Sequence, residues 1–217
     1  MSLIDFTHRI DNNIPVFPGD NPPELIPVVL EGENGYRETS FRITSHTGTH
    51  IDAPSHMIPG GKMLDDFPID KFTGPGITVD LSGKWFSGVR GSLEITKDDL
   101  APLFSRIDNI DFVLIHTGWS NYWGKSEYTD EIPYLSAEAA LFLAEHRLKG
   151  VGIDTISIDR IDSPVFSNHA VFLSRDIIVI ENLTNLDKAP DELFTFFCMP
   201  LYYKDADGSP TRAFGLN

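Results

Sequence analysis

Short runs of apolar and often β-branched residues recur along the chain, with turn-forming residues between them. Runs of this length that are bounded by Gly, Pro, Asn or Asp are typical of strands. The pattern predicts strands at residues 3–7, 41–45 (continuing into the segment that follows), 77–81, 112–116, 151–153, 177–180, 194–202 and 211–214. The last two flank Lys204-Asp-Ala-Asp-Gly208, whose Asp-Gly pair predicts a hairpin turn.

Two segments have the start and stop signals of helices. Thr96 begins a segment with acidic residues in its first turn, and this segment is predicted to be helical to about residue 105. Ser136 caps a second helix, predicted over residues 137–148 and ended by Gly150. Strands and helices alternate in this central part, which predicts βαβ units. We therefore expect one α/β layered domain over residues 1–217, with more strand than helix.

Residues 12–27 contain five of the fifteen prolines, at positions 15, 18, 22, 23 and 27. Regular structure cannot run through the whole of such a segment, because proline lacks the backbone donor that helices and sheets use. A loop of this kind can border a functional site, and a rigid surface loop fits the pattern equally well.

Composition narrows the possible partners and compartments. The 217 residues are 41% apolar and 23% charged, as in ordinary globular proteins, and the net charge is −15. A chain this acidic is not expected to bind nucleic acid or an anionic membrane surface. The single cysteine, Cys198, excludes an internal disulfide, and it lies in a run that is predicted to be a buried strand. No secretory signal or apolar run of about 20 residues is present, so we expect a cytoplasmic protein.

The richest concentration of chemistry is the segment His46-Thr-Gly-Thr-His-Ile-Asp-Ala-Pro-Ser-His56, which holds three of the seven histidines. Imidazole and carboxylate together suit zinc, manganese or iron(II). A straight strand would place the Cα atoms of His46 and His50 roughly 13 Å apart, so we expect a bend, and Gly48 is the residue that allows one. Beyond Pro54 the pattern predicts a loop that carries His56. A metal centre is the first hypothesis and a metal-dependent hydrolase the second; hydrogen-bonded core histidines are the alternative.

A metal centre needs further ligands from other parts of the chain. His169 and Glu181 are the best distant candidates, because Glu181 ends a buried apolar run in which an unpaired carboxylate would be costly. A Glu that caps or makes an ion pair at the end of a strand explains the same position equally well. His8, His116 and His146 are weaker candidates.

The segment His46-x-Gly-Thr-His-x-Asp-x-Pro-x-His56 resembles the signature of the cyclase superfamily of metal-dependent hydrolases, which includes bacterial kynurenine formamidase and isatin hydrolase. The resemblance covers nearly the whole chain. It also includes Phe17-Pro-Gly-Asp20, Gly118-Trp119 with Tyr122-Trp-Gly124, Gly152-Ile-Asp154 with Ser157-Ile-Asp159, Glu181-Asn-Leu183 with Asn185-Leu, and Asp207-Gly-Ser-Pro-Thr-Arg212.

The resemblance implies a site for two divalent metal ions, with zinc first and manganese as the alternative. It implies that His46 and His50 bind the first ion and that Asp52 bridges both. His169 would bind the second ion, Glu181 would contact both ions, and His56 would be the catalytic acid/base. The resemblance further implies a swivelling β/β/α fold and a homodimer or higher homo-oligomer.

The function implied by the resemblance is hydrolysis of a small amide through a metal-activated water, as in arylformamidases, with N-formyl-kynurenine as the first substrate to test. Phe17 and Trp119 are candidates for an aromatic wall around this substrate, although Trp119 could equally be a core residue. The formamidases usually have Trp at the position of Phe17. The alternatives are a hydrolase of a cyclic amide or lactam, a polyketide-type cyclase or dehydratase, and a metal-bound protein that binds a small molecule without turnover.

Overall fold

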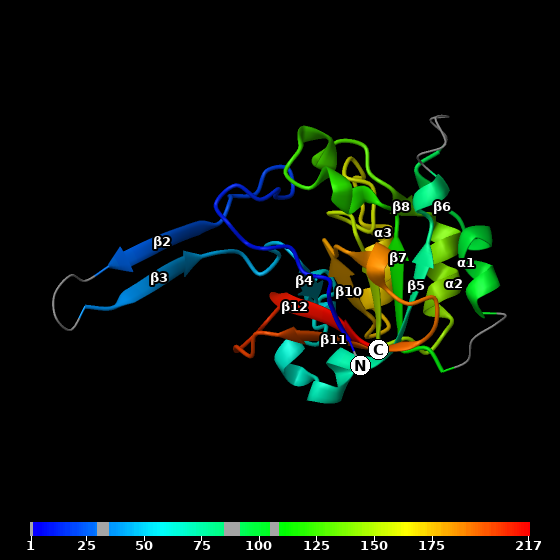
Figure 1. The fold of residues 1–217 in the computed structure, drawn as a ribbon. Coiled ribbons are helices and arrows are strands. Elements are labelled where there is room, and N and C mark those ends of the chain that lie inside the picture. The colour runs from blue at the N-terminus through cyan, green and yellow to red at the C-terminus, as the bar shows by residue number, and fades with distance from the viewer. Residues whose placement is uncertain (1, 30–34, 85–91, 105–108) are drawn as a thin grey trace.

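The main feature of the fold is a mixed sheet that closes on itself. The computed structural model describes residues 2–29, 35–84, 92–104 and 109–217. The strands of the sheet lie in the order β1-β12-β11-β5-β7-β9-β10-β4, and β4 also pairs with β12, so that the seven strands from β12 to β4 form a barrel (Figure 1). These strands are β1 (Leu3–Asp5), β4 (His50–Asp52), β5 (Thr73–Asp80), β7 (Phe112–His116), β9 (Gly150–Ile153), β10 (Ile178–Glu181), β11 (Phe194–Pro200) and β12 (Gly208–Leu216).

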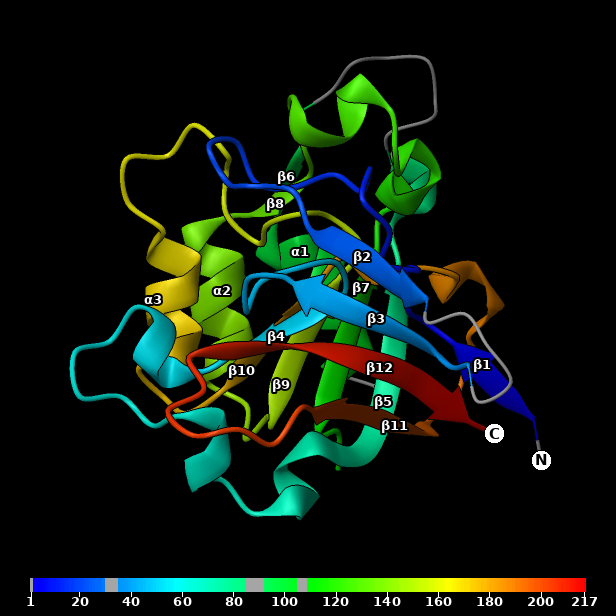
Figure 2. The same cartoon turned by 90° about the vertical axis from the view of Figure 1, so that its left-hand side faces the viewer.

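Three helices cover the parallel part of this sheet. Strands β5, β7, β9 and β10 are parallel neighbours, and helices α1 (Lys97–Phe104), α2 (Ala137–Ala144) and α3 (Ser167–Leu173) are grouped on one side of them (Figures 1 and 2). The predicted βαβ connections of the central chain are therefore confirmed. The chain is of the mixed α/β class with more strand than helix, as predicted.

The apolar run of β7 shows why the strands have no polar face. Val113 and Ile115 pack with the buried side chains of the helices, whereas Phe112 and Leu114 belong to a second apolar cluster with Ile51 of β4 and residues of β10, β11 and β12. Successive residues of a strand point to opposite faces, so a strand that is buried on both faces is apolar throughout. This second cluster fills the interior of the barrel.

A two-stranded hairpin projects from the body of the molecule. Its strands, β2 (Glu24–Val29) and β3 (Arg37–Arg42), pair with each other in a separate sheet (Figures 1 and 2). A further two-stranded sheet joins β6 (Glu94–Ile95) to β8 (Tyr134–Leu135). Pro27 lies within β2, which is consistent with the tolerance of proline in strands that have a free edge.

The structure differs from the predicted elements where local side-chain bonds intervene. The strand predicted at residues 41–45 is correct for Phe41 and Arg42 and wrong beyond them, because β3 ends at Arg42 and the chain then turns. The Thr47 hydroxyl accepts a hydrogen bond from the backbone N–H of Thr44 at 3.0 Å, and such bonds compete with strand pairing. The second predicted helix starts correctly, with the Ser136 hydroxyl as its cap, but it ends at Ala144. The predicted end of the first helix at residue 105 lies outside the described residues.

Candidate metal centre

Three elements and the turn before one of them bring the predicted ligands together. His50 and Asp52 lie on β4, His169 lies on α3, and Glu181 is the last residue of β10. Strand β4 pairs antiparallel with β10 so that Glu181 is directly opposite His50. This register explains how a glutamate that is remote in the sequence reaches the histidine motif.

The turn before β4 brings His46 to the same place. Gly48 has a φ of +64°, in the left-handed region that favours glycine, and it forms the predicted bend. The rings of His46 and His50 consequently lie with their centroids 5.1 Å apart. A straight strand would have separated them by about two and a half times that distance.

Asp52 is at the centre of the cluster and is 1% exposed. Its Oδ1 atom lies 2.6 Å from Nδ1 of His46 and 3.2 Å from Nε2 of His50, and its Oδ2 atom lies 3.4 Å from Nε2 of His169. Burial alone would raise the pKa of this carboxyl group, but the three neighbouring imidazoles hold the pKa well below its usual range. Asp52 is therefore a carboxylate shared by three histidines.

Hydrogen bonds orient two of these histidines toward the carboxylates. His50 donates from Nδ1 to the Gly48 carbonyl oxygen at 2.8 Å, and His169 donates from Nδ1 to Oδ2 of Asp159 at 2.7 Å. In both rings this arrangement leaves Nε2 facing Glu181, at 3.6 Å for His50 and 3.1 Å for His169. A second hydrogen bond of this kind is typical of metal-binding histidines.

The donor set fits a divalent cation. Imidazole nitrogens and carboxylate oxygens, all potential electron-pair donors, face one another across the buried cluster, and Oδ2 of Asp52 has no hydrogen-bond partner among the described residues. One ligand atom each from His50, Asp52 and Glu181 lies within 4.8 Å of the others, and the same holds for His46, Asp52 and His56. Nitrogen and oxygen ligands of this type suit zinc and manganese.

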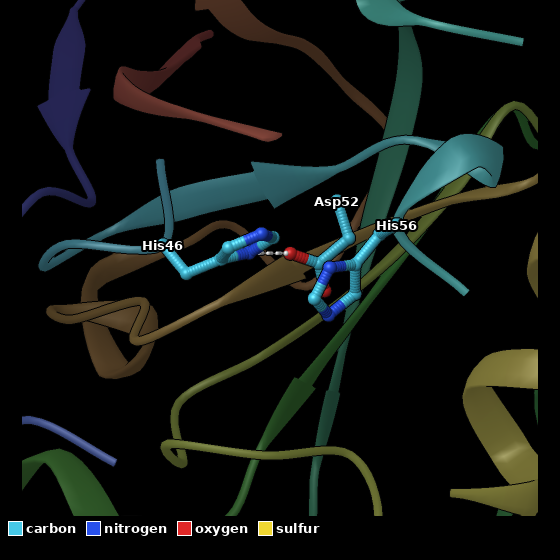
Figure 3. A group of neighbouring side chains, drawn as sticks. All are labelled: His46, Asp52 and His56. Atoms are coloured by element: carbon cyan, nitrogen blue, oxygen red, sulfur yellow. Dashed lines mark hydrogen bonds and ion pairs between the residues drawn. The ribbon is translucent and has the colours of Figure 1, made fainter. Parts of the chain in front are cut away.

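His56 lies at the edge of the cluster, at the end of the short 3₁₀ turn Pro54–His56. Figure 3 shows its ring beside Asp52 and His46, and the centroids of the two imidazoles are 4.0 Å apart. Burial lowers the pKa of His56 to about 4. Burial also acts to lower the pKa of His46, but the Asp52 and Asp207 carboxylates raise it to about 9. The lowered pKa favours the neutral form of His56, and the raised pKa favours a proton on His46 that a bound cation would displace.

A cavity of about 410 Å³ opens onto these residues. Phe17 lines it, together with Phe166, and the two rings meet edge to face with centroids 6.0 Å apart. Trp119 is not part of the lining: its ring packs on Tyr122 and its indole N–H donates to the Tyr128 carbonyl oxygen at 3.2 Å. The structure therefore places Phe17 at the cavity and Trp119 in the packing beside it.

Sequence reasoning missed three residues of this region. The sequence pattern does not indicate Phe166, which lies three residues before His169. Asp159 and Asp207 belong to the segments that resemble the family, but these segments alone do not indicate their contacts with the histidines. Asp207 contacts Nε2 of His46 at 3.1 Å. The available signal was their place in the segments that resemble the cyclase superfamily.

The three weaker histidine candidates lie in other surroundings. His8 stacks on Trp123 with centroids 3.8 Å apart, and His146 stacks on Phe104 at 3.7 Å. Nδ1 of His116 lies 3.0 Å from Oδ1 of Asp80.

We expect Asp159→Asn to weaken metal binding by about 10–100-fold, because the amide removes one carboxylate oxygen that orients His169. The measurement is competition for zinc with a chelator of known affinity. Asp162→Asn is the matched control, since the side chain of Asp162 is 71% exposed and pairs with Arg160 at the surface. Equal affinities of the two variants would contradict an orienting role of Asp159.

Comparisons with known proteins show the family of this chain and structures that are similar to it. The family model described as a putative cyclase matches residues 4–160. A kynurenine formamidase from Bacillus anthracis is 32% identical over 212 residues, which are 97% of this chain and 95% of the relative. Isatin hydrolase A from Labrenzia aggregata has a similar structure, with a TM-score of 0.87, 26% identity and coverage of 99% of this chain and 93% of that one. A potential metal-dependent hydrolase with cyclase activity has a TM-score of 0.79 at 30% identity, and the match covers 99% of this chain and 96% of that one.

Within the part of the chain that the structure describes, no helix combines the length and apolar character needed to span a membrane.

Proposed function

Because the chain belongs to the putative cyclase family, we propose that it is a metal-dependent hydrolase of a small amide, with N-formyl-kynurenine as the first candidate substrate. The observation that carries the proposal is the convergence of Asp52, Glu181 and two oriented imidazoles beside a cavity. A structural role alone would not require an open cavity at such a cluster.

Two divalent ions, preferably zinc, are proposed for this site. His46, His50 and Asp52 would hold one ion, His169 and Asp52 would hold the other, and Glu181 would contact both. The two oxygens of Asp52 face different histidines, His50 and His169, which supports a bridging role. When bound, the ions would supply Lewis-acid activation of water and of the amide carbonyl.

The remaining chemistry belongs to side chains of the cavity. His56 is neutral, so it can take up the proton that the attacking water gives up. It then donates this proton to the amide nitrogen as the C–N bond breaks, which avoids an anionic leaving group. Phe17 and Phe166 present an apolar, aromatic surface on which an aryl ring can pack.

Cleavage of a cyclic amide is the second candidate reaction. The similarity to isatin hydrolase A extends over 99% of this chain, and it favours this alternative. A ring amide would use the same carboxylates and the same proton donor, but its leaving nitrogen would stay attached to the product. The two reactions are therefore distinguished by the substrate and not by the ligands.

We also propose that the protein is a cytoplasmic homo-oligomer without nucleic-acid or membrane partners. The net charge of −15 supports the absence of such partners, and the family resemblance supports self-association. Light scattering after size-exclusion chromatography measures the oligomeric state.

The test of the function is hydrolysis of N-formyl-kynurenine and of isatin by metal-stripped protein to which zinc or manganese is added back separately. We expect turnover that depends on metal and reaches at least about 10⁴ M⁻¹s⁻¹ in kcat/KM with one substrate. Bound metal without turnover of either substrate would reject both substrates and keep the metal site. A protein that binds neither metal would refute the proposed function.

A further inference from the structure

A line of buried polar side chains leads from outside the metal cluster to His50. Tyr128, Asn182 and His50 are 0%, 3% and 3% exposed. The Tyr128 hydroxyl lies 2.8 Å from Oδ1 of Asn182, and Nδ2 of Asn182 donates to the Gly48 carbonyl oxygen at 2.9 Å. The same carbonyl oxygen accepts the hydrogen bond from Nδ1 of His50 at 2.8 Å.

The Gly48 carbonyl oxygen and the Tyr128 hydroxyl together fix the direction of the Asn182 amide. Burial, with the nearby carboxylates of Asp154 and Glu181, raises the pKa of Tyr128 well above its usual range, so the phenol keeps its proton. A hydroxyl can donate or accept, but the Gly48 carbonyl oxygen can only accept, so the amide nitrogen of Asn182 faces Gly48. The amide oxygen then accepts from the Tyr128 hydroxyl, which holds the amide in this orientation.

The Gly48 carbonyl oxygen, to which Asn182 donates, selects the protonation of the His50 ring. The Asn182 nitrogen is a donor and lies 3.5 Å from Nδ1 of His50, while the Gly48 carbonyl oxygen is an acceptor at 2.8 Å from the same atom. A lone pair on Nδ1 would face the carbonyl oxygen at the shorter distance, which is unfavourable. The proton therefore lies on Nδ1, and Nε2 faces Asp52 and Glu181.

We call the hydrogen-bonded series of Tyr128, Asn182, the Gly48 carbonyl group and His50 the relay. The backbone of Asn182 also connects this relay to the proposed ligands. Asn182 directly follows Glu181 and has a φ of +57°, a left-handed conformation that asparagine tolerates better than most residues. Its carbonyl oxygen accepts a hydrogen bond from the Thr49 hydroxyl at 2.6 Å, beside His50. Asn182 thus binds Gly48 through its side chain and Thr49 through its backbone, and these are the two residues that precede His50.

We propose that Tyr128 and Asn182 are positioning residues that hold His50 in its metal-binding tautomer. Neither residue is a proposed ligand, and Tyr128 is not part of the cavity lining. The inference rests on the assignment of His50 as a metal ligand in the proposed function. It predicts that removal of one phenolic oxygen outside the metal cluster weakens metal binding.

The experiment compares Tyr128→Phe and Asn182→Gly with the wild-type protein. Glycine is chosen because it keeps the left-handed backbone conformation of residue 182 while removing the amide. We expect zinc affinity to fall by about 10-fold in Tyr128→Phe and by about 10–100-fold in Asn182→Gly, measured by chelator competition. Tyr134→Phe is the control for loss of a tyrosine hydroxyl, since Tyr134 lies on β8 under the Arg160 guanidinium, and its affinity should stay within about twofold of the wild type.

A second readout uses the metal-free protein and separates positioning from general loss of structure. Solvent exchange of the Nδ1 proton of His50 is followed by nitrogen-edited NMR, with the Nδ1 proton of His169 as an internal reference because Asp159 holds it outside the relay. We expect faster exchange at His50 in both variants and unchanged exchange at His169.

Unchanged zinc affinity with unchanged exchange at His50 would overturn the inference, and so would equal acceleration at both histidines. Failure of the proposed function has a different signature. A wild-type protein that binds no metal refutes that function, while the exchange at His50 in the metal-free protein still decides whether the relay exists.

Discussion

Asp52→Ala is expected to lose its bound metal and to lower turnover of the true substrate by at least about 10³-fold. The reason is the central place of this carboxylate, which lies within 3.4 Å of a nitrogen of His46, of His50 and of His169. The removal of one side chain would therefore weaken every proposed coordination position at once. Elemental analysis of the purified variant measures the metal, and kcat measured with added zinc reports the activity.

Asp52→Asn makes this test stricter. The amide has nearly the same shape, but it is uncharged and one of its two terminal atoms is a donor, so it cannot bridge two cations. Asp191→Asn, an exposed position, controls for the loss of one negative charge. Full metal content in Asp52→Asn would show that Asp52 is not a bridging ligand. Metal content near half of the wild-type value would show that Asp52 is required for only one of the two ions.

His56→Ala is expected to keep its metal and to lower kcat by about 10²–10⁴-fold, which is the usual contribution of a general acid or base. His56 lies with its ring 4.0 Å from that of His46, and its pKa is lowered to about 4 by burial. A neutral imidazole at this position can accept and return a proton, whereas alanine leaves the departing nitrogen without a donor. The readouts are metal content and kcat at saturating substrate.

The same variant decides between two roles that the geometry permits. His56 has a nitrogen close enough to ligand atoms of His46 and Asp52 to share a cation with them. Loss of metal in His56→Ala would identify His56 as a ligand, and normal kinetics would remove it from the mechanism altogether. His146→Ala is the control, because His146 stacks on Phe104 outside the cluster and its loss should leave both readouts unchanged.

His50 shows which parts of the site follow from the motif and which depend on strand pairing. The alternating spacing of His46, Gly48, His50 and Asp52 was enough to predict a metal centre and the bend at Gly48, because both depend on neighbouring residues. The motif does not indicate that Glu181 lies close to His50, because this depends on the pairing of β4 with β10. A shift of this register by one residue would turn the glutamate to the opposite face of the sheet.

The aromatic residues of the cavity wall could not be predicted from the sequence in the way that the histidine motif could. Trp119 and Phe17 were equally plausible aromatic contacts from the sequence, and only Phe17 lines the cavity. Phe166 went unnoticed because α3 was not predicted: its seven residues follow a proline-containing loop and give too short a pattern to recognise. Three-dimensional packing placed this ring beside Phe17.

Local patterning in this chain specifies the buried strands, the capped start of α2 and the chemistry of the histidine motif, since each depends on residues within a few positions of one another. Long-range contacts specify everything that assembles the site: the closure of β4 onto β12, the register between His50 and Glu181, and the orientation of Asn182 toward Tyr128. These contacts join segments that are tens to more than a hundred residues apart. Their selection depends on burial and hydrogen-bond satisfaction over the whole fold, which no short stretch of sequence contains.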